Sequence, residues 1–267
     1  MLLSFAPHFE RDLRGGFSPV LACTDASSTL AATVSTPIGE AVQEALWAHR
    51  IQKRGYVRIL EPEEAAWRCA VDDGDEHTAG VLGRVFHFGE AGPHRKKGDA
   101  ICPWAEDLVE GLDWTPGAVF RTKRTEHINV SEARAVGAEI DLEAADPRFH
   151  RTKGVYAIDS YVFAGAGSKG RSSSRMLNRP LRRSVPTLLL TRMQRGFVHL
   201  RSEHNPADDL TRRTPLRRAR KATPAWATAA ESRGTAALEE AYPELAARRG
   251  AVRGVFRHQA DYAPRPV

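Results

Sequence analysis

The sequence predicts an α/β domain built on a mixed five-stranded sheet with helices on both faces. Five short apolar stretches have the length and composition of buried strands; they are residues 17–24, 31–35, 118–122, 155–159 and 196–201. Segments with helical spacing of apolar residues fall between them, at residues 38–53, 130–145 and 172–194. A hydrophobic content of 42% in 267 residues is enough for a core.

The elements before residue 118 are predicted as follows. An entry segment ends at the Gly15-Gly16 break, and Thr36 caps the first helix with Pro37 in its first turn. Residues 56–117 are expected to be an insertion, or peripheral sub-structure, in a domain that spans residues 1–213. Within the insertion, residues 57–60 and 81–88 could be strands, and residues 104–112 have the pattern of a short amphipathic helix.

The second half of the chain is basic and partly helical. Asn129 or Ser131 is expected to cap the helix at 130–145, and residues 172–194 read as a helix pair broken at Pro180 and Pro186. Residues 214–267 are rich in Arg, Ala and Pro, so we expect a basic, largely disordered C-terminal tail.

Charge is distributed unevenly along the sequence. The net charge is +6, and because residues 168–267 carry +13, residues 1–167 carry −7. This asymmetry suggests an acidic, metal-binding site beside a surface that binds a polyanion such as nucleic acid. A solvated basic face with a flexible basic tail would have the same composition, so this alternative stays open.

Cysteine usage and hydropathy bear on the compartment. The chain has three cysteines and no C-x-x-C pair, which is typical of neither a disulfide framework nor a zinc ribbon and fits a reducing, intracellular compartment, nuclear or cytoplasmic. No apolar run approaches the ~20 residues of a membrane span, and the N-terminus lacks the features of a signal peptide. We expect no association with a membrane.

Four acidic residues sit where strands end or helices begin. Asp25 closes the first strand, Asp159 closes the strand at 155–159, Glu132 lies in the first turns of a helix, and Asp208 follows a turn at Asn205-Pro206. Carboxylates are the ligands that Mg²⁺ prefers, and two such ions can run the hydrolysis of a phosphodiester. The four are therefore predicted to form one divalent-metal site.

Each of these residues also has a structural alternative. Asp25 could close an Asx turn, and Glu132 stands three residues after Asn129, the spacing of a capping box. Asp159 could cap a helix, and the turn before Asp208 needs no catalytic role.

The order of these blocks resembles a known family. The blocks are Ala22-Cys23-Thr24-Asp25-Ala26-Ser27, Asn129-Val130-Ser131-Glu132-Ala133-Arg134, Ile158-Asp159-Ser160, Lys169-Gly170-Arg171-Ser172-Ser173-Ser174 and Asn205-Pro206-Ala207-Asp208 with Thr211-Arg212. Together they resemble the ribonuclease H domain that follows the reverse transcriptase in retroelements, particularly DIRS-like elements. The match covers residues 12–213 in scattered blocks, and the insertion accounts for the long interval between Asp25 and Glu132.

The resemblance implies a ribonuclease H-like fold and a function. It implies Asp25, Glu132, Asp159 and Asp208 as catalytic ligands of two Mg²⁺ ions, with Mn²⁺ as a possible substitute. The implied activity is cleavage of the RNA strand of RNA–DNA hybrids, in a retroelement and possibly beside a reverse transcriptase domain of the same polyprotein. The alternatives are a catalytically inactive nucleic-acid-binding module of the same fold and a non-enzymatic interaction domain.

A basic segment supplies the predicted contacts with nucleic acid. Between residues 168 and 202 there are nine Lys or Arg and no Asp or Glu. Positive and neutral donors suit the backbone of a hybrid duplex, and they are Lys169, Arg171, Ser172, Arg175, Asn178 and Arg182. Ser27, Ser160, Asn205 and Arg212, beside the acidic residues, complete the set.

Two further motifs were weighed. Residues 165–170 satisfy G-x-G-x-x-G, but no acidic residue follows at the distance a dinucleotide site needs, so a nucleotide cofactor is not expected. His204, beside the turn before Asp208, is the one histidine that we consider as a proton shuttle.

Overall fold

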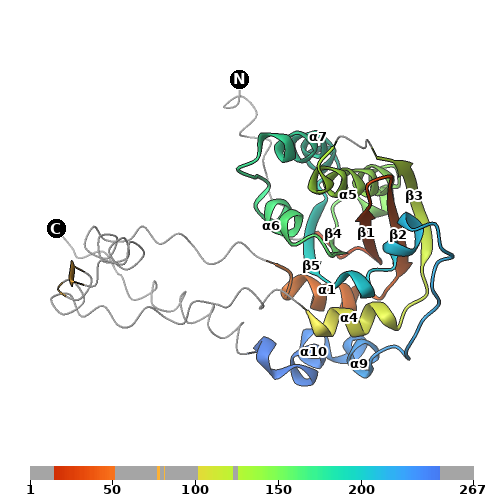
Figure 1. Cartoon of the computed structure of the whole chain (residues 1–267). Coiled ribbons are helices and arrows are strands. Elements are labelled where there is room, and N and C mark those ends of the chain that lie inside the picture. The colour runs from red at the N-terminus through yellow and green to blue at the C-terminus, as the bar shows by residue number, and fades with distance from the viewer. Residues whose placement is uncertain (1–14, 52–76, 79–80, 82–101, 123–125, 247–267) are drawn as a thin grey trace. The chain divides into compact units, whose positions relative to one another are not determined.

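The computed structural model describes residues 15–51, 77–78, 81, 102–122 and 126–246 (Figure 1). The chain forms two compact units, residues 1–52 with 100–267 and residues 53–99. Nearly all the described residues belong to the first unit. The strand expected at 57–60 lies outside the described residues. Of the strand expected at 81–88 only Val81 is described, and it is helical.

The first unit contains a five-stranded mixed sheet in the order β3-β2-β1-β4-β5. In chain order the strands are β1 Val20–Ala26, β2 Leu30–Pro37, β3 Thr115–Arg121, β4 Lys153–Ile158 and β5 Gln194–His199. β1 and β2 form an antiparallel hairpin, β2 pairs antiparallel with β3, and β1, β4 and β5 run parallel. The predicted α/β fold class, with a mixed five-stranded sheet flanked by helices, is confirmed. The carboxyl ends of β1 and β4 therefore lie at the same edge of the sheet.

Side-chain alternation along the strands divides the core into two layers. Leu21 and Cys23 of β1 face one layer, which contains α1 Glu40–Ala48, α4 Pro103–Glu110, α9 Ala225–Arg233 and α10 Thr235–Ala241. Ala22 of β1 and Tyr156 of β4 face the other, which contains α5 Ile128–Ala144, α6 Tyr161–Lys169 and α7 Arg175–Thr191. Figure 1 shows these two helical layers on the two sides of the sheet. Helices thus cover both faces, as predicted.

Two helix starts differ from the prediction. Thr36 and Pro37 are the last residues of β2, paired with Leu21 and Val20, so the next helix begins only at Glu40, after Gly39. α5 begins at Ile128, because His127 caps it and its ring Nδ1 accepts a hydrogen bond from the Asn129 N–H at 3.2 Å. Neither Asn129 nor Ser131 is the cap.

α7 is one continuous helix that contains both Pro180 and Pro186, where a break was predicted. A proline removes one backbone hydrogen bond and crowds the preceding turn. Contacts with α5 and the burial of Leu177, with Leu181 and Leu188 packed beside it, hold the helix together in spite of these losses. Packing overrides local propensity here.

The expected insertion is shorter at its C-terminal end than predicted. α4 contributes Trp104, Leu108 and Val109 to the core, and β3 is an edge strand of the sheet. Residues 102–121 are therefore part of the main unit, whereas the separate compact unit ends at residue 99.

The prediction of a largely disordered tail is wrong for residues 225–241. α9 and α10 pack on α1, and Trp226, Leu238 and Leu245 are buried in the same cluster as α4. The Lys221 Nζ lies 2.6 Å from Glu110 Oε2, and the Tyr242 hydroxyl donates to Asp107 at 2.6 Å. This segment thus completes the core on the α1 face.

Candidate metal centre

β1 brings Asp25 to the edge of the sheet where the parallel strands end. Asp25 is the last residue but one of β1 and pairs with Ala32 of β2. By alternation its side chain lies on the same face as Leu21 and Cys23, and only 5% of the residue is exposed. A carboxylate at this depth needs a cation, a proton or strong hydrogen bonds.

Glu132 reaches the same point from α5. It stands five residues after the cap His127, so it is not part of a capping box, and this structural alternative is excluded. Its Oε1 accepts a hydrogen bond from the Ala26 N–H at 3.3 Å, and only 5% of the residue is exposed. That bond ties the first turns of α5 to the end of β1.

Asp159 follows directly on the last residue of β4. The cap of α6 is Ser160, whose side chain accepts from the Phe163 N–H at 3.3 Å, so Asp159 does not cap the helix. The ring Nε2 of His199 lies 3.0 Å from the Asp159 carbonyl oxygen and fixes the backbone there. Within the described part of the chain, the Asp159 carboxylate has no hydrogen-bond or ion-pair partner.

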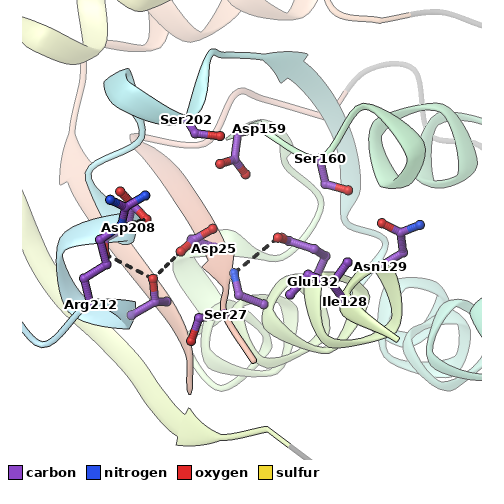
Figure 2. Close-up of a pocket in the computed structure, with 12 residues that line it drawn as sticks. Asp25, Ser27, Ile128, Asn129, Glu132, Asp159, Ser160, Ser202, Asp208 and Arg212 are labelled. Atoms are coloured by element: carbon purple, nitrogen blue, oxygen red, sulfur yellow. Dashed lines mark hydrogen bonds and ion pairs between the residues drawn. The ribbon is translucent and has the colours of Figure 1, made fainter. Parts of the chain in front are cut away.

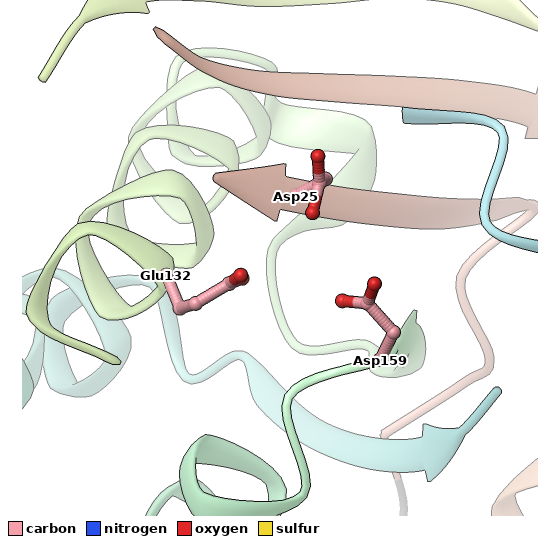
Figure 3. A group of neighbouring side chains, drawn as sticks. All are labelled: Asp25, Glu132 and Asp159. Carbon is pink, nitrogen blue, oxygen red and sulfur yellow. The ribbon is translucent and has the colours of Figure 1, made fainter. Parts of the chain in front are cut away.

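The three carboxylates form one cluster (Figure 3). One oxygen from each of Asp25, Glu132 and Asp159 lies within 4.8 Å of the other two. Among the described residues, no Lys, Arg or His forms an ion pair with any of the three. A buried acidic triad of this kind can hold a metal ion.

Burial and the repulsion between neighbouring carboxylates raise the pKa values of Glu132 and Asp25. Burial, with the charge of Asp159 and then that of Asp25, raises the pKa of Glu132 to about 9. Burial also raises the pKa of Asp25 to about 6; the Thr211 hydrogen bond opposes this shift, and the charges of Asp159 and Asp208 add to it. In the absence of a cation Glu132 therefore keeps its proton at neutral pH, and Asp25 takes one up only as the pH falls below about 6, as expected for massed carboxylates.

Asp208, the fourth predicted ligand, lies in the same pocket but outside the triad. It belongs to the short helix α8 Ala207–Thr211, and its Oδ1 accepts from Arg212 Nε at 2.7 Å. Figure 2 shows Asp208 and Arg212 on the α8 side of Asp25, across from Glu132. All four acidic residues line one open pocket of about 400 Å³.

Two residues anchor α8 to β1, and the sequence did not predict this role for either of them. The hydroxyl of Thr211 donates to Asp25 Oδ2, a second bond links it to the Asp208 carbonyl oxygen, and 4% of the residue is exposed. Asn205 Nδ2 donates to the Thr24 carbonyl oxygen at 2.9 Å. Both residues lie in the block of sequence that ends in Asp208, but nothing in that pattern assigns them a hydrogen bond with β1.

The residues predicted to contact nucleic acid fall into three groups: residues that line the pocket, exposed basic residues and residues with a structural role. Ser27, Ser160 and Arg212 line the pocket; the side chain of Ser27 also closes the β1–β2 turn by accepting from the Leu30 N–H at 3.0 Å. The four basic residues are exposed, and they are Lys169, Arg171, Arg175 and Arg182.

The remaining predicted contacts have structural roles instead. Asn205 is fully buried, so the prediction that it contacts nucleic acid is wrong. Asn178 accepts from the Ser172 N–H and donates to the Ser172 carbonyl oxygen, both at 2.7 Å, which staples the α6–α7 loop. The pair is half-buried, and its amide is used within the chain.

Other residues at the pocket were missed or misjudged. Ser202, Ile128 and Asn129 also line it. His204, considered as a proton shuttle, is not among the lining residues; its Nδ1 lies 2.8 Å from Glu110 Oε1 and its Nε2 2.9 Å from Arg201. The G-x-G-x-x-G stretch lies mainly within α6, so it forms no phosphate-binding loop.

No protein-family model, curated protein or solved structure matches this chain. No helix in the described residues is long and apolar enough to cross a membrane. A functional interpretation therefore rests on the residues of the pocket.

Proposed function

We propose that the chain is a Mg²⁺-dependent endonuclease of ribonuclease H type that cleaves the RNA strand of RNA–DNA hybrids. The observation that carries this proposal is the acidic triad: three carboxylates from β1, α5 and the end of β4 meet in one pocket, and no described cation neutralises them. Such a set costs stability unless a ligand compensates.

The donor set suits a hard divalent ion. All candidate ligands are carboxylate oxygens, and neither His nor Cys is part of the cluster. The pocket is open, which leaves room for the water ligands that Mg²⁺ retains. Asp25, Glu132 and Asp159 would hold one ion, and Asp25 with Asp208 a second. Mg²⁺ in these positions would activate a water molecule and stabilise the leaving oxygen.

The arrangement of the sheet supports the same type of fold. In the order β3-β2-β1-β4-β5, the first three strands pair antiparallel, and β4 and β5 then run parallel to β1, which is compatible with a ribonuclease H-like domain. The resemblance implied the order strand with Asp, helix with Glu, strand with Asp, basic helix, strand and a last Asp. The elements β1, α5, β4, α7, β5 and α8 follow one another in this order, which supports the proposal. The retroelement origin and a neighbouring reverse transcriptase stay predictions.

The chain's own residues would position the hybrid. Ser27, Ser160 and Ser202 place hydroxyl groups on the rim of the pocket, where they can bind phosphate or 2′-hydroxyl oxygens. α6 starts at this rim and ends at Lys169, nine residues further on, about 13 Å away at 1.5 Å per residue. Lys169 and Arg171 would therefore bind the backbone of the duplex away from the reacting bond.

Cleavage of a labelled hybrid by the purified chain tests the proposal. With Mg²⁺ we expect cuts in the RNA strand only, and no cuts with EDTA. Asp159→Asn should lower the rate at least about a hundredfold because it removes one charged ligand of the triad, and it should leave hybrid binding intact. Asp146→Asn, which changes an exposed carboxylate paired with Arg148, is the matched control and should cleave normally.

The other outcomes separate the alternatives. Salt-dependent binding of hybrid without cleavage, under Mg²⁺ or Mn²⁺, would make the chain an inactive binding module. Absence of any salt-dependent binding would favour a protein interaction domain and contradict the proposal. Undiminished cleavage by Asp159→Asn would show that the activity comes from elsewhere.

A further inference from the structure

The side chain of Arg212 occupies the place of a cation at Asp208. Its Nε donates to Asp208 Oδ1 at 2.7 Å, one turn away along α8, and both residues line the pocket. Among the residues that the structure describes, no cation pairs with Asp25, Glu132 or Asp159. Within this part of the chain, the four carboxylates therefore divide into a triad without a protein cation and a fourth member that has one.

The backbone of α8 is held in place independently of this ion pair. The hydroxyl of Thr211 bonds Asp25 Oδ2 and the Asp208 carbonyl oxygen, and Asn205 bonds the end of β1. Asp208 can thus exchange its partner by a side-chain movement while α8 stays in position.

We propose that Arg212 is an internal counter-ion of Asp208 that the second metal ion must displace, so that the two ions bind in order, first at the triad and then at Asp208. The inference rests on the proposed two-ion site. It adds a regulation of that site by cation concentration: at low Mg²⁺ the triad alone is filled, and Asp208 stays paired with Arg212.

The strength of the Arg212 ion pair suits a displaceable partner. The Arg212 side chain is 68% exposed and the Asp208 side chain 15%, and the pair is of the i, i+4 type on a short helix. Exposed pairs of this type contribute little, because solvent screens them. A divalent ion that gains two carboxylates can outcompete such a pair, whereas a buried Arg would block the site permanently.

Binding of Mn²⁺ to the full chain, followed by electron paramagnetic resonance of the free ion, tests the order. The wild-type protein should show one stronger and one weaker site. Arg212→Gln removes the competitor, so it should tighten the weaker site about threefold to tenfold and leave the stronger one unchanged. Arg213→Gln removes the same charge from the next, exposed position and should change the weaker site less.

A third variant tests directly whether Asp208 is a ligand of the weaker site. Asp208→Asn should abolish it, and Arg212→Gln added to that variant should have no further effect. An unchanged or weakened second site in Arg212→Gln, with the stronger site intact, would overturn this inference alone. Absence of any saturable Mn²⁺ binding, or a stronger site that survives Glu132→Gln and Asp159→Asn, would overturn the proposed function and this inference with it.

Discussion

Asp25 and Glu132 show what burial without a counter-charge does to a carboxyl group. Each is 5% exposed, and the structure raises the pKa of Asp25 to about 6 and that of Glu132 to about 9. Because both values lie above those of the unfolded chain, folding takes up protons. The stabilising contribution is complete below the unfolded values, near pH 4, and is lost as the pH rises through 6 and 9.

A divalent ion should reverse this loss. We expect Mg²⁺ to raise the melting temperature more at pH 8 than at pH 5.5. At the lower pH the ion must displace protons from both Asp25 and Glu132, whereas at pH 8 Asp25 is already ionised and only the proton of Glu132 has to leave. Thermal unfolding followed by circular dichroism, with and without Mg²⁺ at each pH, measures the difference. Equal shifts at both pH values, or an undiminished shift in Asp159→Asn, would contradict a metal ion at the triad.

Glu139 allows a separate test of a buried acid away from the pocket. It lies on α5 with 4% of its surface exposed, and burial raises its pKa to about 7, against a lowering effect of Thr33. Its contribution to stability is therefore present below about pH 4.5 and lost as the pH rises through 7. The shift corresponds to a loss on the order of 3 kcal/mol.

Glu139→Gln should remove this pH dependence, because the amide does not ionise. Relative to the wild type, the variant should gain stability at pH 8 and gain less or nothing at pH 5. Urea unfolding at the two values gives the comparison. The same stability difference at both would mean that Glu139 does not change its charge over this range.

At the scale of elements, a buried amide is one of the anchors of α8. Asn205 is fully buried and donates to the Thr24 carbonyl oxygen, and its own Oδ1 accepts from the Ala207 N–H at 3.1 Å. These two bonds join the start of α8 to the strand that carries Asp25. Asn205 was predicted to contact nucleic acid. In the tertiary structure it instead anchors α8 to β1.

Asn205→Ala should lower the free energy of unfolding by about 1–3 kcal/mol, because it leaves a buried carbonyl without a donor. It should also weaken metal binding, since α8 carries Asp208 and Thr211. Asn178→Ala, which removes a half-buried loop staple, is the control and should cost less. If Asn205→Ala weakened hybrid binding at unchanged stability, the anchoring role would be wrong.

At the scale of the whole molecule, the basic C-terminal segment is structural. Trp226, Leu238 and Leu245 are each at most 4% exposed and share one cluster with Leu46 and Trp104. Arg217 binds Asp209 through its Nη2 at 2.6 Å, so the segment is also tied to α8. The composition of the segment, rich in Arg and Ala, did not predict this structural role, because only a few apolar residues make the contacts with the core.

Removal of residues 214–267 should therefore unfold or aggregate the protein, since it uncovers α1 and α4. A chain that ends at residue 246 keeps all these contacts and should retain the wild-type melting temperature. Expression, gel filtration and thermal unfolding of the two truncated chains give the answer. A soluble, cooperatively folding chain of residues 1–213 would instead support the disordered tail that the composition predicted.

The strands, the long helices and the four acidic residues could be read from the sequence, because each depends on local patterns. Asp25 and Asp159 end short apolar runs, and Glu132 follows closely on a predicted helix start. Such local patterns are reliable because the alternation of side chains along a strand fixes the face of the sheet on which each residue lies. Sequence reasoning therefore found the members of the triad.

Tertiary structure alone decided how these residues are used. Pro180 and Pro186 stay within α7 because α5 packs against it, and the C-terminal segment folds because α1 and α4 offer it a surface. Asp208 is paired with Arg212, and its helix is bonded to Asp25 through Thr211, which lies 186 residues further along the chain than Asp25. Long-range contacts and desolvation have no local signal. The sequence therefore determined the candidate ligands, and the fold decided their partners and charges.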